Sequence, residues 1–195
     1  MKTMPAQKPG RSTQDVRTPA DFLYAAQQRL GPFWIDLAAT YRNSVRPRYY
    51  SRADNALVQS WIRPKGQPRT NNDSDWAWCN PPFAHIAPWA RKGLIEAQGG
   101  ASIAMLLPAA VGSNWWKTYV HHQAKALLLN GRLIFKGHKT CYPKDLALVL
   151  FSPDVSFDYE VWTWRTLAAD ASDLSHVPIS AARRAGGPVS LALPR

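Results

Sequence analysis

The sequence predicts an α/β fold: a mostly parallel sheet with an antiparallel hairpin at its C-terminal end. Short apolar runs alternate with helix-spaced segments between residues 18 and 123, which is the order expected of parallel strands joined by helices. The last apolar runs follow one another closely around an Asn130-Gly131 turn, and such a turn is typical of antiparallel neighbours. No internal repeat interrupts this pattern.

The first helix is expected to follow Thr18 as its N-cap, with Pro19 at its first position and Gly31 as its stop. A short apolar strand is expected next at Phe33–Ala38, and this strand carries one acid, Asp36, near its end.

A basic, aromatic connection over residues 40–54 is expected to lead to a weak element at 56–62 and a loop at 63–74, which contains proline, glycine and asparagine. The second strand is expected at Asp75–Cys79. Two prolines follow it closely and cannot continue a ladder of hydrogen bonds, so the strand must end there.

A helix is expected at Ile86–Gln98, ended by the two glycines that follow it. The apolar run Ala101–Leu107 is typical of a strand buried on both faces. Ser113 or Asn114 can cap a further helix that runs through Gln123.

The final strands are expected at Lys125–Leu129, Leu133–Phe135 and Leu146–Phe151. From Thr166 onward, small residues, proline and arginine dominate, and this composition predicts a mobile tail. The domain is therefore expected at 18–165, between a disordered basic arm at 1–17 and a tail at 166–195.

Composition limits where the protein acts. Hydrophobic residues make up 46% of the 195 residues, and the longest nearly uncharged apolar stretch, Gly99–Gly112, is shorter than the roughly 20 residues that span a bilayer. The N-terminus lacks the apolar core of a signal peptide. The two cysteines cannot form a disulfide framework. We therefore expect a cytoplasmic protein with reduced thiols and no membrane contact.

Charge favours a polyanionic partner. There are 24 Lys and Arg against 13 Asp and Glu, a net charge of +11, which suits a protein that neutralises phosphates. Part of this charge lies in the expected arm and tail. A basic run also lies inside the domain, and it comprises Arg42, Arg46, Arg48, Arg52, Arg63, Lys65 and Arg69.

The tetrapeptide Asn80-Pro81-Pro82-Phe83 directly follows an expected strand, where α/β sheets bind ligands. An exocyclic amine on an aromatic base is a poor nucleophile, because its lone pair is delocalised into the ring. An asparagine oxygen and a rigidly held proline-turn carbonyl can each accept one of its N–H bonds and localise that lone pair. Phe83 supplies an apolar face for a flipped base. Asn and Pro are also common in plain turns, so the tetrapeptide alone also fits an ordinary loop.

Several motifs in order resemble the phage-type DNA N6-adenine methyltransferases over about residues 18–152. The segments that carry this resemblance are Thr18–Leu23, Gly31–Thr40, Trp78–Phe83, Leu106–Ala109 and Gly131–Phe135. The resemblance implies a Rossmann-like methyltransferase fold, S-adenosylmethionine as methyl donor and adenine in double-stranded DNA as acceptor. It also implies that the protein acts in the cytoplasm of a bacterial or phage-infected cell.

The resemblance also implies roles for individual residues, which divide into a catalytic group and a donor-binding group. The catalytic group is Asn80, Pro81, Pro82 and Phe83. The donor-binding group is Thr18, Pro19, Asp36 and Asp54. No metal ligand is implied. The chain departs from the family in two ways: the first strand leads into Leu37-Ala38-Ala39-Thr40 without a glycine-rich turn, and Phe83 stands where relatives carry tyrosine.

Other functions remain open at this stage. The amine-holding turn also suits cytosine N4, adenine in RNA or a glutamine amide, although the charge of +11 disfavours a protein acceptor. A DNA-binding protein that has lost catalysis is a further alternative, supported by the missing glycine-rich turn. Cys79 as a nucleophile for C5-cytosine methylation is disfavoured, since a cysteine that ends a buried strand is usually an inert small apolar residue.

Overall fold

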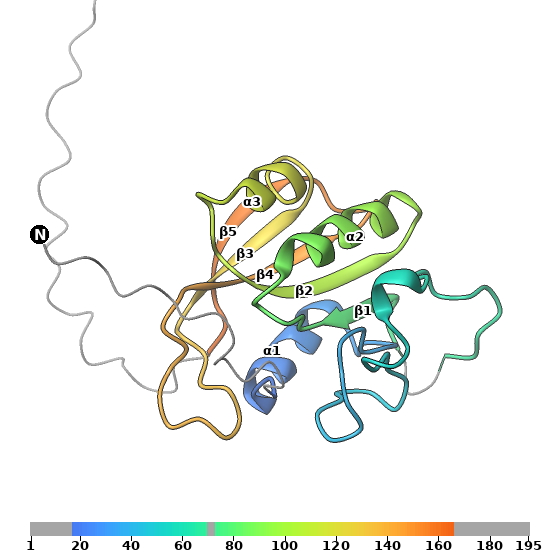
Figure 1. The fold of residues 1–195 in the computed structure, drawn as a ribbon, viewed down its shortest axis with the longest axis horizontal. Coiled ribbons are helices and arrows are strands. Elements are labelled where there is room, and N and C mark those ends of the chain that lie inside the picture. The colour runs from blue at the N-terminus through green and yellow to red at the C-terminus, as the bar shows by residue number, and fades with distance from the viewer. Residues whose placement is uncertain (1–16, 70–72, 166–195) are drawn as a thin grey trace, which may run out of the picture. The chain divides into compact units, whose positions relative to one another are not determined.

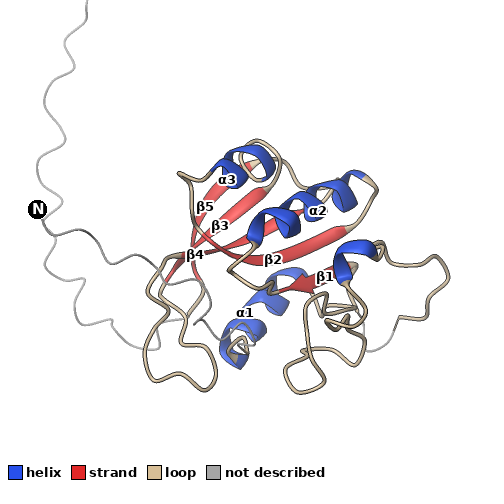
Figure 2. Cartoon of the chain, in the orientation of Figure 1, coloured by secondary structure: helices blue, strands red, loops and turns tan. Residues whose placement is uncertain are grey.

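The computed structural model describes residues 17–69 and 73–165, which all belong to the first of the two units into which the chain divides, residues 1–165. The expected arm, apart from Arg17, and the expected tail lie outside the described residues. The helices are α1 (Ala20–Leu30), α2 (Ile86–Gln98) and α3 (Asn114–Tyr119), with a short 3-10 turn η1 (Ala56–Val58). The strands are β1 (Trp76–Cys79), β2 (Ser102–Pro108), β3 (Lys125–Asn130), β4 (Leu146–Phe151) and β5 (Asp158–Thr163) (Figures 1 and 2).

The five strands form one mixed sheet in the order β1-β2-β4-β3-β5. The β1–β2 and β3–β5 pairs are parallel, whereas β4 is antiparallel to both β2 and β3. One reversed strand thus accounts for both antiparallel pairings, because β4 lies between β2 and β3. An α/β fold is confirmed, but a mostly parallel sheet is not, since the four pairings divide evenly between the two kinds.

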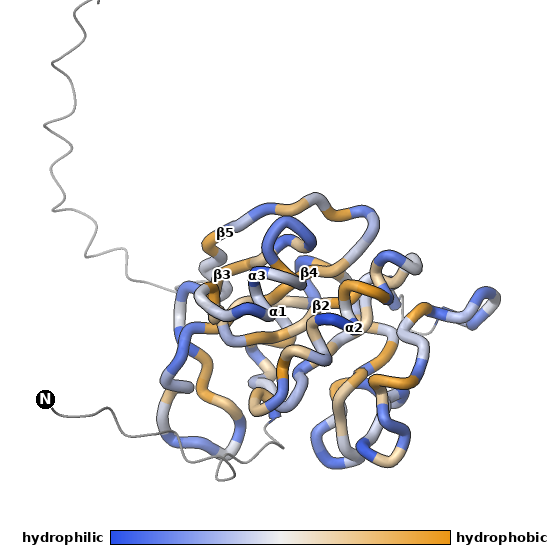
Figure 3. Tube along the Cα trace, turned by 45° about the horizontal axis from the view of Figure 1, so that its top comes forward, coloured by the Kyte–Doolittle hydropathy of each residue, from blue (hydrophilic) through white to orange (hydrophobic). Residues whose placement is uncertain are grey.

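Helices cover both faces of the sheet. α2 and α3 lie over one face and α1 lies over the other (Figure 1). The side chains of β2 alternate accordingly: Ile103, Met105 and Leu107 belong to the hydrophobic cluster under α2 and α3, and Ala104 and Leu106 belong to the cluster under α1. In Figure 3 these buried strands are coloured toward the hydrophobic end of the scale. Successive side chains of a strand point to opposite faces of the sheet, which explains why one sheet contributes to both clusters.

α2 approaches the sheet closely at Gly93. A Cβ at this position would lie 3.0 Å from Met105 Cε and 3.1 Å from a ring carbon of Phe151. Glycine therefore allows the helix backbone to rest on β2 and β4. No described helix has both the length and the apolar character needed to cross a membrane.

Two helix ends differ from expectation. Pro19 rather than Thr18 is the N-cap of α1, and no side chain caps this end. α3 is capped by Ser113 as expected, but it ends at Tyr119 instead of reaching Gln123. The chain leaves helical conformation there, and His122 has a left-handed φ of 60°.

Two expected strands are wrong in their details. The segment 33–38 forms single-residue bridges at Asp36 instead of a regular strand, although its backbone forms hydrogen bonds with β1 on one side and with residues 48–50 on the other. Residues 133–135 form no strand. After Gly131, with a φ of 103°, the chain turns away and Lys136 pairs with Arg17 instead. β3 and β4 are therefore antiparallel neighbours joined by a long loop rather than a tight hairpin.

Candidate active site

Three parallel extended segments end at one edge of the sheet, which we call the carboxyl edge. Asp36 forms parallel bridges with both Tyr49 and Trp78 of β1. Leu37 N donates to Trp78 O at 2.8 Å, and Tyr50 N donates to Asp36 O at 2.8 Å. The residues that follow these segments therefore meet at the carboxyl edge, where ligands of open α/β sheets bind.

Asn80 occupies this edge directly after β1. Its Nδ2 donates a hydrogen bond to Thr18 Oγ1 at 3.2 Å, across 62 positions of sequence. Thr18 is buried, with 8% of its surface exposed. The contact explains why Thr18 does not cap α1, because its hydroxyl instead orients the Asn80 amide. It also brings a predicted donor-binding residue together with a predicted catalytic residue, and Pro19 follows next in the chain.

The two prolines shape the turn that follows Asn80. Pro81 is buried, and Pro82 O accepts a hydrogen bond from His85 N at 3.3 Å just before α2 begins. Neither proline has an N–H to donate, so the turn cannot join the sheet. The result is a rigid backbone segment between β1 and α2.

Phe83 lies where the two hydrophobic clusters meet, and it packs against both. Its ring centroid is 6.2 Å from that of Phe135 and 5.4 Å from that of Tyr142, both in edge-to-face geometry. Phe135 and Tyr142 are themselves 5.7 Å apart. Burial raises the pKa of the Tyr142 hydroxyl. The three rings form an aromatic wall beside the Asn80 turn.

Asp36 is held inside the carboxyl edge with only 3% of its surface exposed. Its Oδ1 accepts from Ala38 N at 3.2 Å and its Oδ2 accepts from Val45 N at 3.1 Å. Burial raises its pKa from 3.8 to about 6, although the two backbone N–H groups oppose this shift. The carboxylate therefore fixes the conformation of the loop 37–45, which takes the place of a glycine-rich turn.

The raised pKa predicts how Asp36 affects stability. Between pH 3.8 and about 6 the folded protein holds this proton while the unfolded chain releases it, so stability falls as pH rises through that window. The loss reaches about 3 kcal/mol above the folded pKa. Urea denaturation measures this loss. We expect the unfolding free energy of the wild type, relative to that of Asp36→Asn, to fall by about this amount between about pH 4 and about pH 8. A difference in unfolding free energy that stays constant with pH would contradict this prediction.

Asp54 lies in the exposed turn that follows the segment 48–50. Its Oδ2 accepts from Ser51 N at 2.7 Å and from Ser51 Oγ at 2.6 Å. These side-chain and backbone hydrogen bonds lower its pKa, so it is ionised at neutral pH. Both bonds end on one oxygen, and the other carboxylate oxygen lies outside them. The structure thus brings Asp54 to the carboxyl edge as a surface anion.

Cys79 ends β1 with no exposed surface and is a free thiol. Burial, and then the negative charge of Asp36, raise its pKa well above the ordinary value. Because the thiolate is the nucleophilic form, this environment disfavours a covalent role for Cys79.

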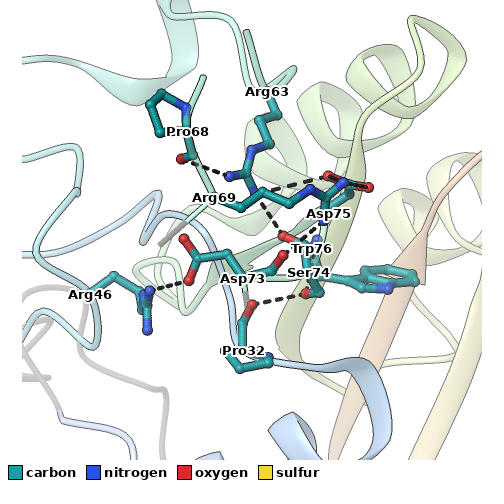
Figure 4. A network of polar contacts seen from close by, with 9 residues as sticks. All are labelled: Pro32, Arg46, Arg63, Pro68, Arg69, Asp73, Ser74, Asp75 and Trp76. Carbon is teal, nitrogen blue, oxygen red and sulfur yellow. Dashed lines mark hydrogen bonds and ion pairs between the residues drawn. The ribbon is translucent and has the colours of Figure 1, made fainter. Parts of the chain in front are cut away.

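Much of the basic run serves the fold. Arg46 forms an ion pair with the buried Asp73. Arg69 donates to both carboxylate oxygens of Asp75 at 2.9 Å, and Arg63 donates to two backbone carbonyls. Figure 4 shows how Arg63 and Arg69 hold residues 63–69 against the start of β1, while Arg46 contacts Asp73. The charges of these three arginines are engaged within the protein, whereas Arg42, Arg48, Arg52 and Lys65 of the same run are exposed.

Sequence reasoning missed two site residues, Phe135 and Tyr142. Phe135 ends the motif Gly131–Phe135, but it was expected in a strand and not beside Phe83. Tyr142 lies in a loop without hydrophobic periodicity, so no pattern in the sequence could have placed it.

Comparisons with known proteins identify the family. Residues 7–149 match the family described as DNA N-6-adenine-methyltransferase (Dam). A DNA N-6-adenine-methyltransferase of Escherichia phage T1 is 25% identical over 116 residues, which are 60% of this chain and 44% of that protein. The chain thus matches less than half the length of this relative. A solved structure of a predicted O-methyltransferase from Agrobacterium tumefaciens is similar over 58% of this chain and 52% of its own, with 12% identity and a TM-score of 0.30.

The family match confirms the resemblance that the ordered motifs predicted. It spans more than two thirds of the chain and includes Thr18, Asp36, Asp54 and the Asn80 turn. The chain therefore belongs to the DNA N-6-adenine-methyltransferase (Dam) family.

Proposed function

We propose that this protein transfers a methyl group from S-adenosylmethionine to the N6 amine of adenine in double-stranded DNA. The observation that carries the proposal is the Asn80 amide, held by Thr18 at 3.2 Å at the carboxyl end of β1 and followed by two prolines. Membership of the Dam family supports the same acceptor.

The chain's own residues prepare the amine for attack. The Asn80 side-chain oxygen and the Pro81 carbonyl each accept one N–H of the amine, which draws its nitrogen toward tetrahedral geometry. The nitrogen then bonds the methyl carbon as the carbon–sulfur bond breaks, with the electron pair left on sulfur. One amine proton is released to solvent. No enzyme nucleophile is needed, in agreement with the raised pKa of Cys79.

The donor is placed beside this turn. S-adenosylmethionine supplies an electrophilic methyl group on a positively charged sulfur. The carboxyl edge suits such a group, since it carries the two carboxylates Asp36 and Asp54. We assign Asp36 to ordering the loop 37–45 around the donor, and the outer carboxylate oxygen of Asp54 to a ribose hydroxyl. Thr18 and Pro19 border the same space.

Adenine in a duplex is stacked, so its N6 reaches Asn80 only when the base is flipped out. Phe83 offers a ring face to the flipped base. The ring is held by Phe135 and Tyr142, so it costs little conformational freedom on binding.

Methyl transfer from labelled S-adenosylmethionine to unmethylated duplex DNA, followed by nucleoside analysis, tests this function. We expect the label in N6-methyladenine. Label in N4-methylcytosine, or in RNA offered in place of DNA, would overturn the proposed acceptor. Absence of donor binding by calorimetry would instead favour a DNA-binding protein without catalysis.

A further inference from the structure

The loop 131–145 between β3 and β4 is a basic surface beside the site. Lys136, Lys139 and Lys144 are exposed, and none of them forms an ion pair within residues 17–69 and 73–165. Arg132 pairs with Asp145 at 3.4 Å, but both side chains remain more than half exposed. The loop contains four basic residues against one acid, apart from His138. In Figure 3 its outer end is hydrophilic.

This loop is fixed against the candidate active site. Lys136 N donates to Arg17 O at 3.0 Å, and Arg17 directly precedes Thr18. At its far end, Asp145 O accepts from Ala109 N at 2.9 Å. The loop also contributes Phe135 and Tyr142 to the aromatic wall around Phe83. Its lysines are therefore carried by a segment whose apolar side contacts the catalytic turn.

The position of the loop in the sheet places its charges on the same side as the chemistry. β1, β2, β3 and β5 all run in one direction, so the loop that leaves β3 starts at the carboxyl edge. Asn80 leaves β1 at that edge. A duplex whose base enters the site must present its phosphates to the surface around the entrance, because the flipped nucleotide stays joined to its strand.

We propose that the loop 131–145 binds the phosphate backbone of the DNA strand that carries the target adenine, through Lys136, Lys139 and Lys144. This inference rests on the proposed function. It assigns phosphate contacts to this loop in addition to any that the basic run at 42–69 makes. In that run Arg46, Arg63 and Arg69 are engaged within the protein, whereas Arg42, Arg48, Arg52 and Lys65 are exposed.

The double variant K136E/K139E tests the assignment. Its side chains are exposed, and the bond between Lys136 N and Arg17 O involves only backbone, so the fold is expected to persist. Binding of a fluorescent duplex is measured by anisotropy over a series of salt concentrations. We expect affinity to fall by about tenfold or more at low salt, and the slope of log K against log salt to decrease by about 1.8, since each lost phosphate contact contributes about 0.9.

The control K65E/R91E changes net charge by the same amount. Lys65 and Arg91 are exposed and form no ion pair among the described residues. Lys65 precedes β1 at the opposite edge of the sheet, and Arg91 lies in the middle of α2. We expect this variant to bind DNA within about threefold of the wild type, since only long-range, salt-screened interactions change.

Outcomes separate this inference from the proposed function. A wild type that does not bind or methylate DNA would refute the function, and the inference with it. A wild type that methylates DNA while K136E/K139E and K65E/R91E lose equal affinity would refute the loop assignment alone. K136Q/K139Q guards against an effect of added negative charge, and it is expected to lose affinity to a smaller degree. Calorimetry with S-adenosylmethionine verifies that each variant keeps an intact donor site.

Discussion

Asn80→Ala is expected to lower the rate of methyl transfer to DNA by about a thousandfold, the size of effect seen when one preorganised hydrogen-bonding group is removed from an active site. The substitution removes the oxygen that accepts an N–H of the target amine. Donor affinity is expected to stay within about threefold, because the residues proposed to bind the donor, Asp36 and Asp54, are unchanged. Single-turnover transfer and donor calorimetry measure the two effects separately.

Two further variants distinguish a chemical role for Asn80 from a structural one. Asn80→Asp keeps an acceptor oxygen, and the Thr18 hydroxyl can reverse its role and donate to it, so partial activity is expected. Thr18→Val removes the hydroxyl that orients the amide with little change in side-chain volume. We expect a lower kcat with an unchanged affinity for DNA, and Thr18→Ser is expected to restore most of the rate.

These variants set a clear condition for failure. Normal methylation by Asn80→Ala would refute the role of this amide in holding the amine. If Asn80→Ala lost transfer only because it had unfolded, donor binding and the unfolding free energy would fall together. A loss of transfer at unchanged stability is the result that the proposal requires.

The sequence was informative where strong local signals coincide. α2 has the predicted bounds, because its helical spacing ends at two glycines, and β4 has the predicted bounds, because it is a continuous apolar run. β5 was missed. It alternates polar and apolar residues at the sheet edge, and its pairing with β3 is supported by ion pairs from Lys125 to Asp158 and Glu160, which no local pattern reveals.

The candidate site shows the same division. The turn after β1 could be predicted, since consecutive prolines end a strand wherever it lies. The hydrogen bond between Thr18 and Asn80, and the contact of Tyr142 with Phe83, join residues far apart in sequence. Such contacts depend on strand order and on the path of the loop 131–145, so only the folded structure supplies them.

Trp61→Ala is expected to lower the free energy of unfolding by about 3–5 kcal/mol, the usual cost of truncating a large buried aromatic residue. Trp61 has no exposed surface. Its Nε1 donates to Ala56 O at 2.8 Å and its backbone N donates to Glu96 Oε2 at 2.8 Å. The residue thereby joins the segment that carries Asp54 to α2.

Matched variants show which part of Trp61 matters. Trp61→Phe keeps most of the apolar contact and loses the Nε1 bond, but Ala56 O still accepts from Gln59 N, so a cost of about 1–2 kcal/mol is expected. Trp89 stacks on Trp61 at a centroid distance of 6.0 Å and is only half-buried, so Trp89→Ala is expected to cost about 1 kcal/mol.

Urea denaturation measures the unfolding free energy of all three variants. If Trp61→Ala cost no more than Trp89→Ala, Trp61 would not be the anchor of this segment. If it cost more and also weakened donor binding, the link from α2 through Trp61 to the Asp54 turn would account for both effects.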